Sequence, residues 1–334
     1  MKAYEIQKFG FENLKLVERP QPEPATGEVL IRVRALSLNF RDLLILKGHY
    51  NARMPLPRVP LSDGAGEVVA VGQGVTRVSV GDRVMGNFSQ SWLDGEPTLE
   101  KSRGALGGDV DGMATEFVAL SQEGVVRVPA HLSDEEAATL PCAAVTAWNA
   151  LVRQGNIKAG DTVLLLGTGG VSLFALQFAR LFGARTIITS SSDEKLARAR
   201  ELGAHDTINY RSVPEWERRV LDLTGGRGVD HIVEVGGAGT LPKSLRAVRV
   251  GGCIALIGVL TGVGDVNPLP IIMRSIQVRG VFVGSRTMFE EMNRAIELHR
   301  LKPVVDRVFD FDELPAALRY MESGAHFGKI VVRV

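Results

Sequence analysis

The stretch that decides the fold is TVLLLGTGGVS, residues Thr162–Ser172, which runs directly into LFALQFARLFGA. An apolar run of strand length enters a glycine turn and continues into an amphipathic helix. In a parallel α/β sheet, such a turn brings backbone N–H groups and a helix N-terminus together, which is the geometry that binds a dinucleotide pyrophosphate. The turn residues expected at the cofactor are Gly167, Thr168, Gly169, Gly170 and Val171.

The glycine pattern alone is weak evidence, because Ser172 stands where a GxGxxG motif has its third glycine. A tight strand-to-helix turn without a ligand is the alternative. No Lys-Ser or Lys-Thr pair follows the glycines, which disfavours a Walker-type phosphate loop. We expect the small Ser172 to preserve cofactor binding and to loosen the helix–strand contact slightly.

The composition limits the class of protein. A chain of 334 residues is long enough for two domains with separate cores. The formal net charge of +1 gives no electrostatic reason to expect nucleic acid or a membrane surface as a partner. The longest apolar run, 171–182, contains Gln177 and Arg180 and is too short to span a bilayer. Two cysteines exclude a disulfide scaffold and suit a reducing compartment, so we expect a cytoplasmic protein. The partner that we expect is a small-molecule substrate.

The pattern along the chain changes near Ser133. The first 130 residues are β-rich, with a polar, glycine-rich loop at 87–112, and a helix is predicted from Ser133 to Leu151. Strands and helices then alternate, which predicts an α/β fold with a doubly wound, six-stranded parallel sheet. The predicted strands are 162–167, 185–190, 207–210, 229–236, 253–259 and 276–284, with helices at 171–182, 193–202, 214–224 and 239–248. A helix at 287–301, a short helix at 312–322 and a strand at 328–334 complete the chain.

The end of the second strand indicates which nicotinamide cofactor binds. An acidic residue there would bind both ribose hydroxyls and repel a 2′-phosphate. The expected position is Ser190, with Ser191 and the cation Lys195 close in sequence and Tyr210 at the end of the third strand. This favours NADPH, with NADH possible, since the serines could instead cap the next helix and Asp193 could take the acidic role.

Several stretches, in order, resemble the medium-chain dehydrogenase/reductase superfamily over essentially the whole chain. They are 35–42 (ALSLNFRD), 63–68 (DGAGEV), 80–84 (VGDRV), 140–151 (LPCAAVTAWNAL), 202–204 (LGA) and 325–331 (AHFGKIV). The resemblance implies a GroES-like catalytic domain at 1–132 and 285–334, and a Rossmann cofactor domain at 133–284. It also implies a homodimer that pairs the sixth Rossmann strand, 276–284.

The resemblance raises the question of zinc. Zinc-dependent members bind the catalytic metal with two cysteines and a histidine, and the matching positions here carry Asn39, Ser62 and Cys142. An amide and a hydroxyl cannot replace a thiolate and an imidazole. The four cysteines of the structural zinc site are also missing from 87–112. We therefore expect no metal at either site.

Without zinc, hydride transfer favours an acceptor that conjugation already makes electrophilic, so a quinone, enone or enal is expected. The resemblance to zinc-free reductases suggests that Asn39 and Tyr50 donate hydrogen bonds, although Asn39 could merely cap a turn and Tyr50 could be a loop aromatic. Arg41 binds substrate or pairs with Asp42. The alternatives are an alcohol dehydrogenase that works without zinc and a non-catalytic, crystallin-like NADPH-binding protein.

Residues at the carboxyl ends of the later strands are expected to contact the nicotinamide, because this edge faces the ligand in such sheets. They are Gly236, Ile257, Val259, Phe282 and Val283. In relatives, the residue at the position of Thr146 also lies near the nicotinamide.

Overall fold

The computed structural model describes residues 1–262 and 264–334. The chain forms two compact units, one made of Met1–Val145 with Gly284–Val334 and the other of Thr146–Val283. The expected limits 1–132, 133–284 and 285–334 remain a prediction about which segments fold as domains. Each unit is described by itself.

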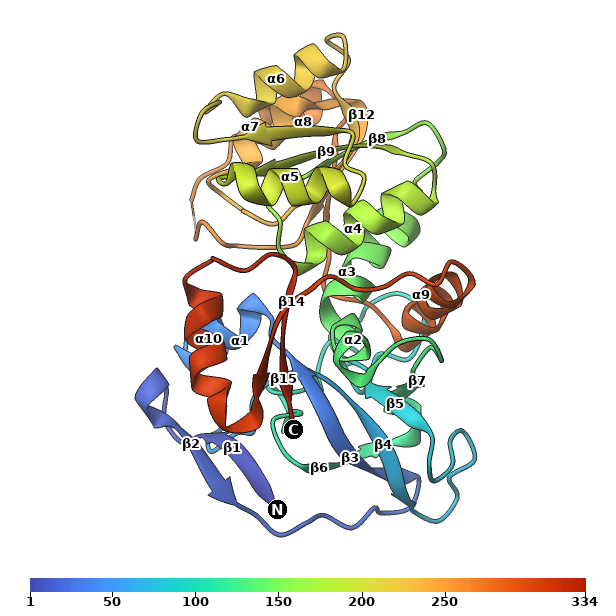
Figure 1. Ribbon diagram of the computed structural model, residues 1–334. Coiled ribbons are helices and arrows are strands. Elements are labelled where there is room, and N and C mark those ends of the chain that lie inside the picture. The colour runs from blue at the N-terminus through green and yellow to red at the C-terminus, as the bar shows by residue number, and fades with distance from the viewer. Residues whose placement is uncertain (263) are drawn as a thin grey trace. The chain divides into compact units, whose positions relative to one another are not determined.

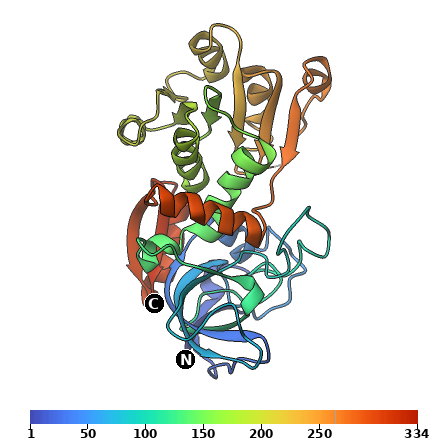
Figure 2. The ribbon, with the colours of Figure 1, turned by 90° about the vertical axis from the view of Figure 1, so that its right-hand side faces the viewer.

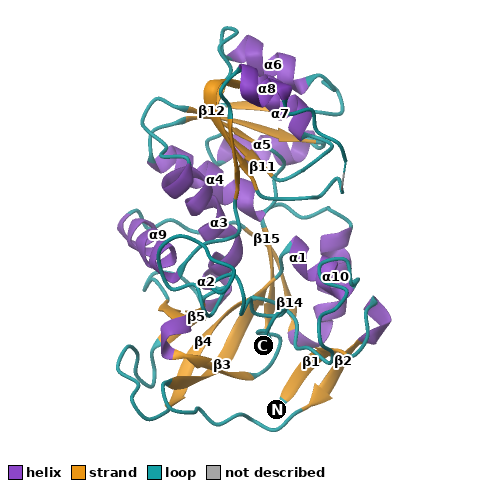
Figure 3. Ribbon diagram, turned by 180° about the vertical axis from the view of Figure 1, so that it is seen from behind, coloured by secondary structure: helices purple, strands orange, loops and turns teal. Residues whose placement is uncertain are grey.

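The unit Thr146–Val283 contains a parallel sheet in the order β10-β9-β8-β11-β12-β13. Its strands are β8 (Thr162–Leu165), β9 (Arg185–Ser190), β10 (Asp206–Asn209), β11 (Val229–Glu234), β12 (Val248–Leu256) and β13 (Gln277–Gly280). The helices are α4 (Gly170–Leu181), α5 (Asp193–Glu201), α6 (Trp216–Leu223), α7 (Leu241–Ala247) and α8 (Leu269–Met273), and they cover both faces of the sheet (Figures 1 and 3). The predicted doubly wound, six-stranded parallel sheet is confirmed.

Two predicted elements differ from the structure. The sixth strand is short because its partner β12 ends at Leu256, opposite Gly280, and the chain beyond it turns into a left-handed conformation at Val283, with φ of 46°. The single helix expected at 133–151 is divided into α2 (Asp134–Ala137) and α3 (Val145–Trp148), with wider π-helical turns beside α3. Pro141 lies in the first of these turns, where it cannot donate a backbone hydrogen bond to the preceding turn.

The other unit is built from both ends of the chain, and Figure 2 shows the two termini within it. Its seven-stranded sheet has the order β14-β15-β3-β4-β5-β7, with β6 paired to β3. The strands are β3 (Glu28–Ser37), β4 (Asp63–Val71), β5 (Arg83–Gly86), β6 (Phe117–Ser121), β7 (Val125–Arg127), β14 (Val305–Asp310) and β15 (Lys329–Arg333), beside a hairpin of β1 (Lys2–Ile6) and β2 (Leu14–Glu18). The helices are α1 (Phe40–Leu46), α2, α9 (Arg286–Leu298) and α10 (Leu314–Glu322).

The register of this sheet brings the chain ends together at one place. Strand β15 runs antiparallel to β3, with Val331 opposite Ser37, and β3 pairs with β4, with Ser37 opposite Asp63. The first residue of β15, Lys329, therefore lies beside the residues that follow β3. Burial of Ile31, Leu36 and Val332 anchors these strands in the core of the unit. Across the described parts of the chain, no helix is long and apolar enough to cross a membrane.

Candidate functional site

The glycine turn between β8 and α4 leaves space for a ligand. Gly167 has a positive φ of 74°, which favours glycine, whereas Gly169 has an ordinary extended backbone. No described atom outside the chain neighbours lies within 4 Å of the position that a Cβ on Gly169 would occupy. No side chain caps the N-terminus of α4, and its first turn has no acidic residue. Neither backbone strain nor packing within the protein requires a glycine at position 169. The open space beside the helix N-terminus therefore fits a dinucleotide pyrophosphate.

Ser172 makes a specific contact between helix and strand. Its side chain is buried, and its Oγ donates a 2.6 Å hydrogen bond to the backbone oxygen of Leu166, just after β8. The expectation of a looser contact is therefore wrong. The hydroxyl replaces the close packing that a third glycine allows with a direct hydrogen bond.

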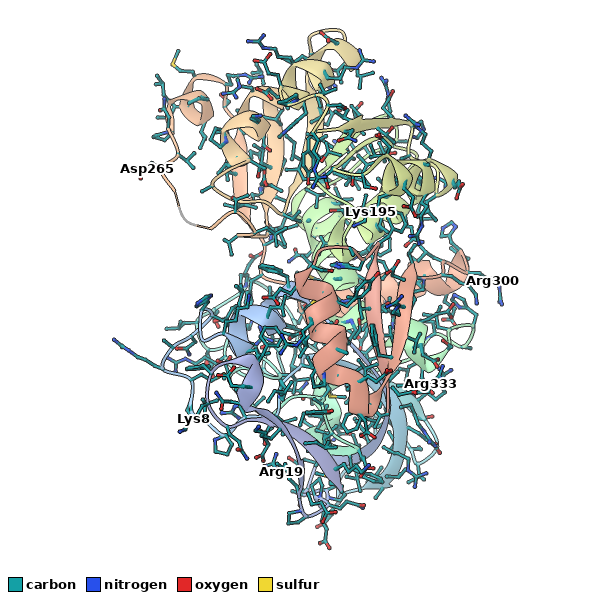
Figure 4. All side chains as sticks on the ribbon, turned by 60° about the vertical axis from the view of Figure 1, so that its left-hand side comes forward. Lys8, Arg19, Lys195, Asp265, Arg300 and Arg333 are labelled. Carbon is teal, nitrogen blue, oxygen red and sulfur yellow. The ribbon has the colours of Figure 1, made fainter. Side chains whose placement is uncertain are left out.

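The end of β9 carries the residues predicted to select the cofactor. Ser190 is buried, its Oγ accepts a hydrogen bond from Ser192 N, and its backbone oxygen accepts one from Tyr210 N. Ser192 caps α5 by accepting from the backbone N–H of Lys195, whose side chain Figure 4 labels. Asp193 accepts a 2.8 Å hydrogen bond from Asn209. The structure thus brings Ser190 and Tyr210 together, with Ser191 next to them and only half-buried.

A buried carboxylate organises the loop after β11, and sequence reasoning missed it. Glu234 is fully buried, and its Oε1 accepts hydrogen bonds from Gly236 N at 2.8 Å, Gly237 N at 3.1 Å and Thr240 Oγ1 at 2.6 Å. Its Oε2 accepts a further hydrogen bond from Ser244. Such a carboxylate fixes the loop at the carboxyl end of the sheet, where a cofactor is expected to bind.

The other residues predicted near the nicotinamide lie on the same unit but differ in exposure. Val259 is 58% exposed and Phe282 is 38% exposed, while Thr146 and Val283 are buried. The backbone oxygen of Val283 accepts a 2.7 Å hydrogen bond from Asn149, which holds the left-handed conformation. The backbone N–H of Ile257 donates a 2.9 Å hydrogen bond to the backbone oxygen of Glu234, which continues the hydrogen-bond ladder between β11 and β12 past the end of β12.

The predicted catalytic residue Asn39 begins α1 in the other unit. Its backbone N–H donates to Asp42 Oδ2 at 2.7 Å, and the two residues form a capping box. The side chain does more than cap the helix, since its Oδ1 accepts a 2.6 Å hydrogen bond from the ammonium of Lys329. The Asn39 Nδ2 is buried and faces the carboxyl group of Asp63, whose charged form it stabilises, although within residues 1–262 and 264–334 it makes no hydrogen bond of normal geometry.

A charged cluster surrounds this amide. Lys329 Nζ also donates to Leu38 O at 2.6 Å and lies 3.8 Å from Asp63 Oδ2, with both charged side chains at most 3% exposed. Burial raises the pKa of Asp63, against the opposing effect of Lys329. Burial also raises the pKa of Asp42 to about 7. Sequence analysis missed Asp63 and Lys329. The signal for Lys329 was a cation directly before the apolar run 330–332.

The residues at the three positions where zinc-dependent relatives bind metal do not fit a zinc ion. Asn39 Oδ1 accepts from Lys329, and Ser62 Oγ donates to Asp63 Oδ1 at 2.8 Å. Burial and the neighbouring Asp63 raise the pKa of the Cys142 thiol, and Cys142 is the one residue of the three whose side chain could become a thiolate ligand. In the described residues, no group of three His, Cys, Asp or Glu side chains is arranged to hold a metal ion.

Arg41 and Tyr50 lie against each other. The Arg41 guanidinium lies 4.9 Å from the centre of the Tyr50 ring and 4.8 Å from that of Phe88, and it donates a 3.0 Å hydrogen bond to Leu106 O. Arg41 is buried, whereas Tyr50 is 42% exposed. The ring of Tyr50 thus covers a buried cation and is itself accessible to a ligand.

A dinucleotide-binding sheet and a β-sheet unit with a buried polar cluster define this chain as a dinucleotide-dependent oxidoreductase. Residues 25–130 match the alcohol dehydrogenase GroES-like domain family, and residues 170–298 match the zinc-binding dehydrogenase family. The chain is 46% identical to a zinc-type alcohol dehydrogenase-like protein of Schizosaccharomyces pombe, over 97% of this chain and 96% of the relative.

Solved structures agree with this match. A putative alcohol dehydrogenase from Sinorhizobium meliloti is 43% identical, with a TM-score of 0.94 over 100% of this chain and 98% of the other. A mycobacterial protein solved with NADPH is 29% identical, with a TM-score of 0.85 over all of both chains. The chain belongs to the alcohol dehydrogenase-like, medium-chain dehydrogenase/reductase superfamily. It is an enzyme that uses a nicotinamide cofactor and acts on a small-molecule substrate.

Proposed function

We propose that this enzyme is a zinc-independent, NADPH-preferring reductase of quinones or of conjugated enones and enals. The observation that carries the proposal is the chemistry of Asn39 and Ser62, which offer an amide oxygen already engaged by Lys329 and a hydroxyl engaged by Asp63 where a zinc site needs anionic or imidazole ligands, so that Cys142 alone could supply such a ligand. Without a Lewis acid, conjugation in the acceptor has to supply the electrophilicity.

The residues of the catalytic unit support charge stabilisation rather than metal chemistry. Bound NADPH supplies a hydride, and the acceptor gains one hydride and one proton overall. Asn39 Nδ2 has two N–H groups and makes no hydrogen bond of normal geometry in the described chain, so one N–H can face Asp63 while the other meets the negative charge that develops on the acceptor oxygen. The exposed Tyr50, next to the buried Arg41 cation, is placed to donate a hydrogen bond. The proton comes from Tyr50, from His49, which precedes Tyr50 in the chain, or from water.

The preference for NADPH is supported by the neutral Ser190 at the end of β9 and by the engagement of Asp193 with Asn209. The substitution Ser190→Asp tests this directly. We expect it to raise the KM for NADPH at least about 10-fold, because a carboxylate repels the 2′-phosphate, and to leave the KM for NADH unchanged or lower. Unchanged KM values for both cofactors would remove Ser190 from the site.

Steady-state assays test the reaction. We expect NADPH oxidation with a panel of quinones, enones and enals, and turnover that is insensitive to a zinc chelator. Metal analysis of the purified protein should show no stoichiometric zinc. The second candidate is an alcohol dehydrogenase that works without zinc, and the names of the relatives support its alcohol dehydrogenase activity but not its independence of zinc. Turnover confined to alcohols with NAD(P)⁺ would establish that candidate, and tight NADPH binding without any turnover would indicate a non-catalytic protein.

We also propose a homodimer and a cytoplasmic location. Within the described sheet, β13 is an edge strand, and the adjacent α8 exposes 71% of Ile272 and 73% of Met273. Two such side chains beside an open strand edge support pairing with a second copy. Analytical ultracentrifugation at micromolar concentration should give twice the 36.1 kDa chain mass, and a monomer would contradict the dimer. The free thiols Cys142 and Cys253 suit a reducing compartment, which cell fractionation would test.

A further inference from the structure

We propose that Lys329 is a positioning residue for the reaction. Its buried ammonium holds the amide oxygen of Asn39, so that the amide N–H becomes a fixed, charge-assisted donor to the acceptor oxygen. The ammonium thereby contacts Asn39, the residue that aligns with a metal ligand of zinc-dependent relatives. This inference rests on the proposed function, in which Asn39 contacts the acceptor.

The contacts of the ammonium show that it is held firmly. Nζ donates to Leu38 O and to Asn39 Oδ1, both at 2.6 Å, and lies 3.8 Å from Asp63 Oδ2. The Lys329 side chain is 3% exposed. A buried ammonium is costly unless it is hydrogen-bonded and paired, and here all three partners come from the segment after β3 and the start of β4. The fold thus holds a desolvated cation next to the Asn39 amide, with Leu38 O and Asp63 as its other partners.

The orientation of the Asn39 side chain follows from that contact. Because Lys329 has only donors, the atom that faces it must be the amide oxygen, and Nδ2 must point elsewhere. The Nδ2 atom is buried and makes no normal hydrogen bond within residues 1–262 and 264–334. An amide nitrogen carries two N–H groups, and the Asp63 carboxyl group can engage only one of them. The other is a buried donor that a ligand oxygen can complete.

The ammonium also strengthens this donor. A cation on the amide oxygen draws electron density from the nitrogen, so Nδ2–H becomes a better donor, and the low local dielectric increases the effect. The charged neighbours are Asp63 on β4, and Arg41 and Asp42 on α1. Two cations thus face two carboxyl groups, and the protonated Cys142 adds no negative charge. The cluster can therefore accept the negative charge that develops on an acceptor oxygen.

A double-mutant cycle tests whether Lys329 acts through Asn39. The variants are Lys329→Met, which keeps the length of the side chain without its charge, Asn39→Ala, and the combination of the two. We expect Lys329→Met to lower kcat at least about 10-fold, with the KM for NADPH unchanged within about twofold. In the Asn39→Ala background the same substitution should change kcat by less than about twofold, since the residue that it positions is gone. The control Lys302→Met removes an exposed lysine that pairs with Glu136, and should leave kcat unchanged.

Melting temperature and NADPH affinity, measured by fluorescence for each variant, separate this role from a structural one. A structural lysine would lower the melting temperature and would cost the same factor in kcat in both backgrounds, which would overturn the inference. Wild-type kcat in Lys329→Met would also overturn it. Where the wild type oxidises alcohols only, the proposed function fails, yet the cycle measured on that reaction still decides the role of Lys329. If Lys329→Met does not fold, Lys329→Arg is measured in both backgrounds against the same criterion of coupling.

Discussion

The buried carboxyl group of Asp42 should make the stability of this protein depend on pH in a direction opposite to that of most aspartates. Asp42 is 2% exposed, and burial raises its pKa from 3.8 to about 7, against the opposing effects of Arg41 and Lys329. Between pH 4 and pH 7, the folded protein holds a proton that the unfolded chain has lost. The free energy of unfolding therefore falls as pH rises from 4 to 7. Above pH 7, Asp42 is ionised in both states and no longer makes stability depend on pH.

The size of the effect follows from the two pKa values. A difference of about 3 pH units corresponds to on the order of 4 kcal/mol, at about 1.4 kcal/mol per unit. The substitution Asp42→Asn removes the titration and keeps an oxygen that can accept from the backbone N–H of Asn39. At pH 5 the variant and the wild type should differ by less than about 1 kcal/mol. At pH 8 the variant should be more stable by up to about 4 kcal/mol, or about 8 to 16 °C in melting temperature for a unit of this size.

Differential scanning calorimetry measures this difference. Both proteins are compared at pH 5, 6, 7 and 8, at constant ionic strength and without cofactor. The control Asp312→Asn removes a carboxylate whose side chain is 71% exposed, in the same unit, and should show no such trend. A melting-temperature difference between Asp42→Asn and wild type that is the same at all four pH values would refute the reasoning, because it would show that Asp42 titrates equally in the folded and unfolded chain.

Three further substitutions test the cofactor unit. Gly169→Val should weaken NADPH binding at least about 10-fold in a fluorescence titration, because the added side chain occupies the space for the pyrophosphate. The melting temperature should stay within about 2 °C of wild type, because a Cβ at this position meets no protein atom, and a loss of stability instead would show that packing requires the glycine. Glu234→Gln should cost about 1 to 3 kcal/mol in thermal unfolding, because a charged acceptor of four hydrogen bonds becomes neutral, and an unchanged melting temperature would contradict this. Ser172→Ala should cost about 1 kcal/mol through the lost bond to Leu166 and leave NADPH affinity within twofold, and a large loss of affinity would place Ser172 at the cofactor.

The sequence predicted the parallel sheet well, because buried parallel strands are short apolar segments and turn-forming residues separate them. Strand β9 has both predicted bounds, 185 and 190. Strand β12 starts five residues earlier than predicted, at Val248, because Gly251 and Gly252 resemble a turn in sequence. Strand β13 is shorter than its apolar run, since hydrophobic periodicity cannot reveal where the partner strand β12 ends, opposite Gly280.

Prediction of the site was less complete, for a different physical reason. Asn39 was found through the resemblance, yet its partner Lys329 lies 290 positions further along the chain. Only the register of β15 on β3 brings them together, and register depends on the packing of the whole sheet. Glu234 escaped notice because its four partners are backbone and hydroxyl donors, which leave no charge pattern in the sequence.

The distribution of these groups implies that cofactor affinity and chemical rate can be altered separately. The glycine turn and the Glu234 loop belong to the unit Thr146–Val283, while Asn39, Asp63 and Lys329 belong to the unit that both chain ends build. Each cluster is closed by hydrogen bonds within its own unit. Substitutions at independent sites that share no partners are additive in free energy. A loss of NADPH affinity from Gly169→Val and a loss of kcat from Lys329→Met should therefore multiply in the double variant, and coupling between them would show that cofactor binding reorganises the lysine cluster.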